Sequence, residues 1–563
     1  MKPAHEKYIP FVPLKMTRRA WPDRELKAPP VWCSVDLRDG NQALIDPMNV
    51  REKLELFHTL VDIGVKEIEA GFPSASETEY EFIRTLIEGG HIPDDVTIQV
   101  LVQAREHLIR RTFEAIDGAK HVIFHFYNST STLQRKVVFH TDVEGVKKIA
   151  VDAARLIREL SQPALDAGMD LRYEYSPESF MGTEMDAAVE ICQAVIEAIG
   201  ATPEHKVILN LPTTVENCMP NYFADEIEYF ISRLPGRDRA IISLHPHNDR
   251  GEGVATAELG LLAGAERVEA TLFGNGERTG NVDMVTLALN LYTQGVDPKL
   301  DFSDINKIRD VYERVTKMKI GERQPYVGEL VFTAFSGSHQ DAINKGTRYM
   351  EESGTEYWEV PYLPIDPADV GRQYEPIIRI NSQSGKGGSA FVMQHSFGFD
   401  LPKAMHPEFG HIVQVETDRV GKELKPDAIY DLFKTHYIDA VKPYQLVQHS
   451  FAEFTDEAGH SHVTFAGTIR HTDTVFQVQG SGNGPINAFF NAIHGQKMDR
   501  FTFIDYKEHA VKQGSDSQAV AYIHLQDENG RDWFGVGMSH NINLAPLKGI
   551  LSAINRAVSH DGK

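Results

Sequence analysis

The sequence predicts an α/β protein whose largest domain is a (β/α)8 barrel, or TIM barrel, followed by smaller domains. Between about residues 31 and 300, β-rich runs alternate with helix-length segments, and parallel strands need such crossovers. The β-rich runs number eight, which is the number that closes this kind of barrel. The 563 residues also exceed what one hydrophobic core normally serves, so we expect two or three domains.

Each of the eight runs is short, apolar and rich in β-branched or aromatic residues. In chain order they are VWCSVDLRDG (31–40), VKEIEAGFP (65–73), TIQVLVQ (97–103), HVIFHFYNS (121–129), LRYEYSPES (171–179), KVILNLPTT (206–214), AIISLHPHND (240–249) and RVEATLFGNGE (267–277). Helical segments separate them, and within 182–200 apolar residues recur at i, i+3 and i+4 before a closing Gly. A doubly wound open sheet is the alternative, but the first run lacks the phosphate-binding glycines of that fold.

The domain boundaries follow changes in this pattern. We predict a Pro-rich arm at 1–30, the barrel at 31–305, helical linker subdomains at 306–438 and a C-terminal α+β module at 439–563. In the last module, Asn529-Gly530 favours a tight hairpin turn between two β-rich segments.

Composition restricts the class of protein. The chain is 42% hydrophobic and 24% charged, and it has neither an apolar run near the roughly 20 residues of a membrane span nor the apolar core of a secretion signal. Three cysteines form no disulfide or metal-knuckle pattern, which indicates a reducing compartment and a cytoplasmic location. The net charge of −23 argues against nucleic acid as a partner, so small-molecule chemistry is favoured.

The motif SLHPHNDRG, from Ser243 to Gly251, indicates a metal site. His245 and His247 lie two residues apart, so in a strand they face the same side, and Pro246 between them suits a strand end. Active sites of this fold are assembled at the carboxyl ends of the strands. With Asp39 from the first run, the two imidazoles form a nitrogen and oxygen donor set suited to Zn²⁺, Mn²⁺ or Mg²⁺, and Asn281 is placed to add an amide oxygen.

Other polar residues also fall at predicted strand ends and would surround the same opening. They are Arg38, His125, Tyr127, Glu178, Thr213 and Thr214.

Long motifs carry a resemblance to a known family. They include VDLRDGNQALIDPM, HFYNSTSTLQRKVVF, EYSPESFMGTE, SLHPHNDRG, LFGNGERTGNVD, SGSHQDAINKG, PYLPIDPADVGRQYE and NSQSGKGG. From about residue 8 to near the C-terminus, the sequence resembles the long form of the 2-isopropylmalate synthase family.

The resemblance implies a condensation of acetyl-CoA with 3-methyl-2-oxobutanoate, giving (2S)-2-isopropylmalate and CoA. It implies a divalent metal on Asp39, His245, His247 and Asn281, and K⁺ as an activator. The implied catalytic residues are Arg38 for the enolate, Glu178 as general base, and His339 and Tyr374 from the connecting segment, acting across a homodimer. The implied substrate-binding residues are His125, Tyr127, Ser176 and Thr214.

The C-terminal module resembles a regulatory domain that binds leucine at a dimer interface as an allosteric inhibitor. The residues implied for that pocket are Gly480, Gly482, Asn483, Gly484, Pro485, Tyr506 and Ala510. A plain turn at the glycines is the alternative.

Three other functions stay open at this point. A sibling enzyme would make citramalate or homocitrate from another 2-oxoacid, because pocket shape separates these reactions. A lyase on a similar barrel would run the reverse cleavage, although the C-terminal module argues against it. A non-catalytic amino-acid sensor would have lost its metal ligands, and all four are present.

Overall fold

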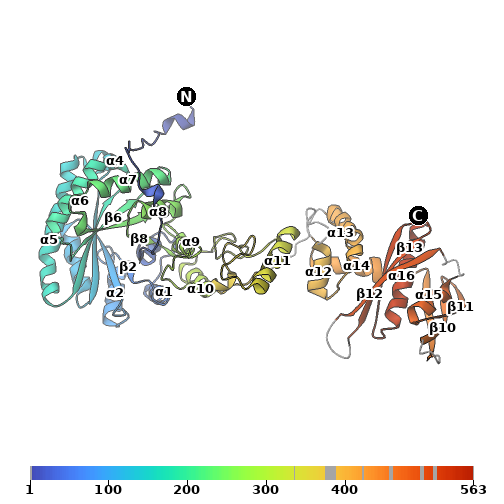
Figure 1. The fold of residues 1–563 in the computed structure, drawn as a ribbon. Coiled ribbons are helices and arrows are strands. Elements are labelled where there is room, and N and C mark those ends of the chain that lie inside the picture. The colour runs from blue at the N-terminus through green and yellow to red at the C-terminus, as the bar shows by residue number, and fades with distance from the viewer. Residues whose placement is uncertain are drawn as a thin grey trace. The chain divides into compact units, whose positions relative to one another are not determined.

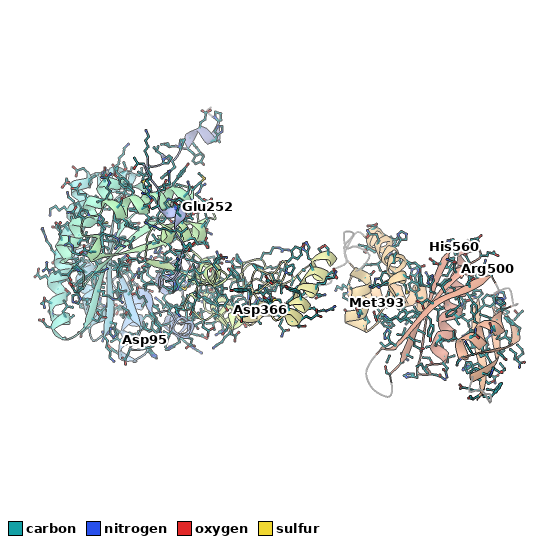
Figure 2. The ribbon with its side chains drawn as sticks, viewed as in Figure 1. Asp95, Glu252, Asp366, Met393, Arg500 and His560 are labelled. Atoms are coloured by element: carbon teal, nitrogen blue, oxygen red, sulfur yellow. The ribbon has the colours of Figure 1, made fainter. Side chains whose placement is uncertain are left out.

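The computed structural model describes residues 3–334, 336–374, 388–420, 424–455, 461–494, 500–511 and 517–561. The chain forms two compact units, one of Met1–Phe332 with Leu363–Tyr374 and the other of Thr333–Tyr362 with Glu375–Lys563 (Figure 1). Side chains fill the space between the helices and strands of each unit (Figure 2).

The first unit contains the predicted barrel. Its eight parallel strands pair in sequence order, and β1 also pairs with β8, which closes the barrel. The strands are β1 (Val31–Ser34), β2 (Glu67–Gly71), β3 (Thr97–Gln103), β4 (His121–Ser129), β5 (Asp170–Glu178), β6 (Val207–Thr213), β7 (Ala240–Pro246) and β8 (Arg267–Ala270). All eight lie within the runs predicted from the sequence or extend them by one residue, so the predicted fold class is confirmed.

Helices surround the strands (Figure 1). They are α1 (Val50–Ile63), α2 (Glu77–Glu88), α3 (Glu106–Ile116), α4 (Thr132–Gln134), α5 (Val143–Asp166), α6 (Met185–Ile199), α7 (Pro220–Arg233), α8 (Gly253–Leu262), α9 (Met284–Tyr292) and α10 (Ile305–Thr316). Their ends follow local chemistry: α1 starts at a reciprocal capping box between Asn49 and Glu52 and ends at Gly64, whose φ is 105°. In α6, the residues at i, i+3 and i+4 spacing are buried against the barrel, as their periodicity predicts.

The first β-rich run departs from its prediction. Strand β1 ends at Ser34, and Asp36–Gly40 forms a π-helical turn instead of continuing the strand. The neighbouring strand β8 ends at Ala270, so the chain beyond Val35 has no strand to pair with on that side. Both oxygens of the Asp36 carboxylate accept from the Leu272 N–H at 3.1 Å, and this bond holds the turn against the chain that follows β8.

The arm before the barrel is anchored by polar contacts. Arg19 forms a two-pronged ion pair with Asp225 on α7, with N–O distances of 2.7 and 2.8 Å, and the Trp21 indole donates to the same carboxylate.

The second unit has α11 (Gly337–Ser353) and an α+β module that contains two antiparallel three-stranded sheets. The remaining elements are α12 (Gly388–Phe397), α13 (His406–Val420), α14 (Pro426–Phe433), β9 (Tyr444–Thr455), β10 (Ser461–His471), β11 (Thr474–Gly482), α15 (Pro485–Ile493), β12 (Phe501–Ala510), β13 (Ala519–Asp527), β14 (Asp532–Ser539) and α16 (Leu544–Asp561). The sheet orders are β11-β10-β9 and β12-β13-β14. Each set of three strands is followed by a helix, and one apolar core joins Phe465 and Phe489 to Leu525 and Ile554.

The other face of the second sheet packs on helices. Val520 and Tyr522 of β13 share a core with residues of α12, α13 and α14. Gly530 has φ 76° in the turn between β13 and β14, which agrees with the hairpin predicted from Asn529-Gly530. Among the described residues, every helix is too short or too polar to cross a lipid bilayer.

Candidate metal and substrate site

A cavity of about 290 Å³ opens at the carboxyl ends of the barrel strands. Its wall consists of Arg38, Asp39, Gln42, Phe72, Leu101, His125, Tyr127, Ser176, Glu178, Asn210, Pro212, Thr214, His245, His247, Glu277 and Arg278. The polar residues that the sequence placed at strand ends therefore lie around one space, apart from Thr213, whose hydroxyl accepts from the His247 N–H at 2.9 Å.

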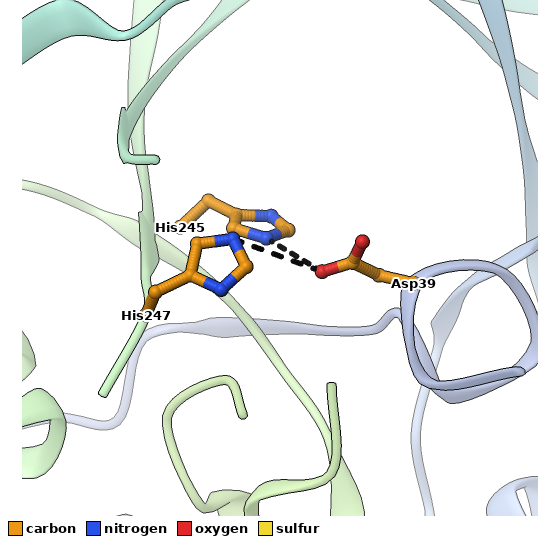
Figure 3. Close-up of side chains that lie close together, drawn as sticks. All are labelled: Asp39, His245 and His247. Atoms are coloured by element: carbon orange, nitrogen blue, oxygen red, sulfur yellow. Dashed lines mark hydrogen bonds and ion pairs between the residues drawn. The ribbon is translucent and has the colours of Figure 1, made fainter. Parts of the chain in front are cut away.

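Asp39, His245 and His247 converge in this cavity. Figure 3 shows both imidazoles facing the Asp39 carboxylate, with Asp39 Oδ2 lying 3.3 Å from His245 Nε2 and 3.9 Å from His247 Nε2. The imidazole ring centres are 5.2 Å apart, and all three side chains are buried. Each offers a ligand atom within 4.8 Å of the others, which is the spacing that a shared ion requires.

Two orphaned atoms support the same interpretation. Asn281 pairs with His247 across an isolated β-bridge, and its Oδ1 is buried without a hydrogen-bond partner among the described residues. The Nδ1 atom of His247 is also buried without a hydrogen-bond partner among the described residues. Buried polar atoms are rarely left unpaired, so the free amide oxygen of Asn281, on the residue paired with His247, fits a ligand to a divalent cation.

The electrostatics of the three residues differ. Burial alone would raise the pKa of Asp39, but Arg38 and His245 outweigh it and hold that pKa well below its usual range. Burial and the neighbouring His245 lower the pKa of His247 to about 4, so its imidazole is neutral at pH 7, the form that binds a metal. Burial opposes protonation of His245, but Asp39 and Glu269 raise its pKa to about 9. Metal binding would therefore release a proton from His245.

A second layer of buried polar groups lies beneath the metal site. His245 Nδ1 donates to Glu269 at 2.6 Å, and Arg38 Nε donates to Glu69. The Gln99 amide donates to both carboxylates at 2.7 Å, and His125 Nδ1 donates to Glu69 at 2.7 Å. Glu69, His125 and Glu269 also have the spacing of a metal site. Because the Gln99 amide already satisfies the two carboxylates, this second group is a closed hydrogen-bond network.

Sequence reasoning missed this layer, although a signal was present. Glu69, Gln99 and Glu269 are polar residues in buried strands, and their alternation with apolar neighbours places them on the inward face.

The predicted catalytic residues of the barrel lie beside the metal ligands. Arg38 Nη1 donates to Asp39 at 2.7 Å, so its guanidinium lies next to the Asp39 carboxylate. Glu178 ends β5, lines the cavity and accepts from the Ser129 hydroxyl.

The predicted substrate-binding residues also line the cavity. His125 Nε2 and Ser176 Oγ are hydrogen-bonded at 2.7 Å. Burial, together with Glu178, raises the pKa of Tyr127. Thr214 Oγ1 accepts from the Ser179 N–H at 2.8 Å, which leaves its hydroxyl proton available to a ligand.

The two predicted catalytic residues of the connecting segment belong to different units. Tyr374 belongs to the first unit but does not line the cavity, and its hydroxyl is buried without a partner among the described residues. His339 belongs to α11 of the second unit, where its ring stacks on Tyr362 at 4.0 Å.

Two of the residues predicted for leucine binding already have packing roles. A Cβ at Gly480 would lie 2.4 Å from the Ala492 nitrogen, and a Cβ at Gly482 would lie 2.3 Å from Asn487 Oδ1. Strand β11 therefore needs both glycines in order to approach α15, with or without a ligand.

The other predicted leucine-site residues lie close by in the sequence or on β12. The Asn483 N–H donates to the Asn487 side chain, Gly484 is the N-cap of α15 and Pro485 is its first residue. Tyr506 lies half exposed on β12, and Ala510 ends that strand.

Several wall residues were not predicted from the sequence. Phe72, Leu101 and Pro212 form apolar parts of the wall, while Gln42, Asn210, Glu277 and Arg278 add polar groups. Arg278 has φ 56° and bonds to Asp249 at 2.6 Å and 3.0 Å. Phe72, Leu101 and Pro212 have no sequence motif that marks them as wall residues, because only closure of the barrel brings them together.

Comparisons with known proteins cover nearly the whole chain. Residues 29–312 match the HMGL-like family, 329–394 match the alpha-isopropylmalate synthase post-catalytic domain-like family, and 423–558 match the LeuA allosteric (dimerisation) domain. The chain is 53% identical to a 2-isopropylmalate synthase of Clostridium acetobutylicum, over 98% of this chain and 99% of that protein. It is 53% identical to the Brucella suis biovar 1 protein of that name, over 99% of both, and 52% identical to that of Pseudomonas putida, over 99% and 98%.

Proposed function

The chain belongs to the 2-isopropylmalate synthase family, a class of acyltransferases, and on that premise we propose that it condenses acetyl-CoA with 3-methyl-2-oxobutanoate. The products would be (2S)-2-isopropylmalate and CoA. The observation that carries the proposal is the convergence of Asp39, His245 and His247 in one cavity, beside the unpartnered Asn281 Oδ1.

These four residues would hold a divalent cation such as Mg²⁺, Mn²⁺ or Zn²⁺. When bound, such an ion acts as a Lewis acid that makes the ketone carbon of the 2-oxoacid more electrophilic. The protein supplies the donors in a buried setting, with Glu269 fixing the tautomer of His245 so that Nε2 faces the site.

Other residues of the cavity wall bind the substrate, remove a proton from acetyl-CoA and stabilise the enolate. Thr214 donates its free hydroxyl proton to the substrate carboxylate. Glu178 takes a proton from the methyl group of acetyl-CoA, and the Arg38 guanidinium stabilises the negative charge on the thioester oxygen of the resulting enolate. The enolate carbon then bonds to the ketone carbon while the π electrons of the C=O bond move to the ketone oxygen, which takes up a proton to become the product hydroxyl. Water hydrolyses the thioester to release CoA. His339 and Tyr374 stay proposals for assisting that hydrolysis.

The apolar wall favours a branched 2-oxoacid. Phe72, Leu101 and Pro212 offer no partner for a second carboxylate, so 2-oxoglutarate would be disfavoured there.

The second unit supports a regulatory role. Its match to a LeuA allosteric (dimerisation) domain motivates the proposal that the chain forms a homodimer and that leucine bound there slows condensation. A titration of leucine against initial rate tests this, and a rate independent of leucine would contradict it.

Release of CoA, measured with a thiol reagent, tests the catalytic proposal. The rate is expected to be highest with 3-methyl-2-oxobutanoate, to vanish with EDTA and to return with Mg²⁺ or Mn²⁺, and K⁺ is expected to increase it. A higher kcat/KM with pyruvate or 2-oxoglutarate would favour a citramalate or homocitrate synthase instead.

A further inference from the structure

Two loops that lie outside the regular sheet bring oxygen donors to the metal site. The π-helical turn Asp36–Gly40 carries Asp39, and the loop that follows β8, residues 271–283, carries Asn281. Barrel pairing does not fix the distance between these loops, so particular hydrogen bonds must set it.

Besides the bond between Asp36 and the Leu272 N–H, Asn275 supplies such bonds through its side-chain amide and its backbone carbonyl. Its side-chain Nδ2 donates to the Gly40 carbonyl at 2.9 Å, one residue from Asp39. Its own backbone carbonyl accepts from Asn281 Nδ2 at 2.9 Å and from the Thr271 hydroxyl at 2.7 Å.

The bond to Asn281 fixes the orientation of that amide. A carbonyl oxygen can only accept, so the group facing Asn275 must be the NH2 of Asn281. The Oδ1 atom is therefore the free end, and it is the atom left buried without a partner among the described residues.

Gly276 and Gly280 allow the loop around Asn275 to pack closely. A Cβ at Gly276 would lie 2.2 Å from Asn281 Nδ2, and a Cβ at Gly280, whose φ is 98°, would lie 1.8 Å from the Gly274 carbonyl oxygen. The loop packs this closely on itself and on the Asn281 side chain only because both residues are glycines.

From these contacts we propose that Asn275 is a positioning residue that sets the spacing and orientation of the Asp39 and Asn281 oxygens for a divalent cation. It acts through the two loops and does not line the substrate cavity. The inference rests on the metal site of the proposed function.

The substitution Asn275→Asp tests it. Aspartate keeps the size and the backbone carbonyl but loses the donor, and it places a carboxylate oxygen against the Gly40 carbonyl. Affinity for Mn²⁺, measured by calorimetry on the substrate-free protein, is expected to fall roughly 10- to 100-fold. The kcat at saturating Mn²⁺ is expected to stay within about threefold of wild type, because the displaced donors still bind at high metal concentration.

Two further variants separate positioning from general destabilisation. Asn275→Ala removes the bond without the repulsion, so a smaller loss of Mn²⁺ affinity is expected. Asn128→Asp is the control, because the Asn128 amide also donates to a backbone carbonyl, that of Val146 at 3.2 Å, although Asn128 is buried and Asn275 is only partly buried. It is expected to lower the melting temperature and to leave Mn²⁺ affinity unchanged.

The outcomes are distinct. Unchanged Mn²⁺ affinity in a folded Asn275→Asp protein would overturn the inference, as would an equal loss in the Asn128→Asp control. If wild type binds Mn²⁺ but condenses none of the three 2-oxoacids, the proposed function fails while the role of Asn275 is still decided by affinity. If wild type binds no divalent cation, both fail.

Discussion

Replacing Glu269 by Gln should weaken metal binding, because Glu269 is not a metal ligand but accepts a hydrogen bond from the ligand His245. Its carboxylate accepts four hydrogen bonds, two on each oxygen, from Gln99 at 2.7 Å, Arg267 at 3.2 Å, Asn210 at 2.9 Å and His245 at 2.6 Å. All four partners are donors. An amide at this position must point its NH2 at two of them, whichever way it is turned.

The damaging orientation faces the amide NH2 toward His245. The imidazole can then accept through Nδ1 only by moving its proton to Nε2, the atom that lies 3.3 Å from Asp39 Oδ2. A protonated Nε2 cannot bind a metal. In the other orientation, the amide NH2 faces the N–H donors of Gln99 and Arg267. The same buried layer of polar groups must then rearrange. Changes of this kind weaken metal affinity roughly 10- to 100-fold, which corresponds to about 1.4–2.7 kcal/mol.

Calorimetric titration of the substrate-free protein with Mn²⁺ checks this prediction, with Glu174→Gln as the control. Glu174 is buried in the same barrel interior, and burial raises its pKa well above the usual range despite the opposing charge of Arg267. Burial therefore favours its neutral form, which glutamine imitates, and its replacement should change Mn²⁺ affinity by less than about threefold. Equal affinities for the Glu269→Gln variant and wild type would refute the argument.

Three further predictions follow from single residues. Burial and the neighbouring Asp225 raise the pKa of Glu226 to about 8, above its unfolded value of 4.5, so its contribution to stability is full below about pH 4.5 and is lost as the pH rises through 8. The Glu226→Gln variant should escape this loss, worth at most about 5 kcal/mol, so its melting temperature relative to wild type should be higher at pH 9 than at pH 5.5; a pH-independent difference would contradict this. Leu101→Ala enlarges the apolar wall and should shift kcat/KM toward longer branched 2-oxoacids by about tenfold, measured as a ratio of two substrates, and an unchanged ratio would exclude Leu101 from the selective wall. Asp39→Ala should abolish both Mn²⁺ binding and condensation, and retention of either would remove Asp39 from the metal site.

Local periodicity carried much of the fold prediction. Eight β-rich runs were identifiable because buried parallel strands are nearly continuous apolar segments, and the buried face of α6 followed from its 3.6-residue repeat. The pairing of His245 with His247 on one face follows from the two-residue period of a strand, which needs no tertiary information. The specific residue roles came from long motifs, because a family resemblance carries information that periodicity lacks.

The sequence could not supply the contacts that barrel closure creates. Gln99 bonds to Glu269, which is 170 residues away, and Asn275 bonds to Gly40, which is 235 residues away. The local pattern determines on which side of a strand a side chain lies. It does not determine which distant residue that side chain contacts. The turn at Asp36–Gly40 was misassigned for the same reason, because β1 ends where its neighbour β8 ends.

The sequence by itself therefore determined the order of the barrel elements, the strand face that His245 and His247 share and many of the polar residues at the mouth of the barrel. The tertiary structure decided which of those residues meet, how the Asn281 amide is oriented and which buried carboxylates are satisfied. The physical reason is that hydrogen bonds and ion pairs require specific partners at about 3 Å, and residues far apart in the chain reach that distance only once the barrel has closed.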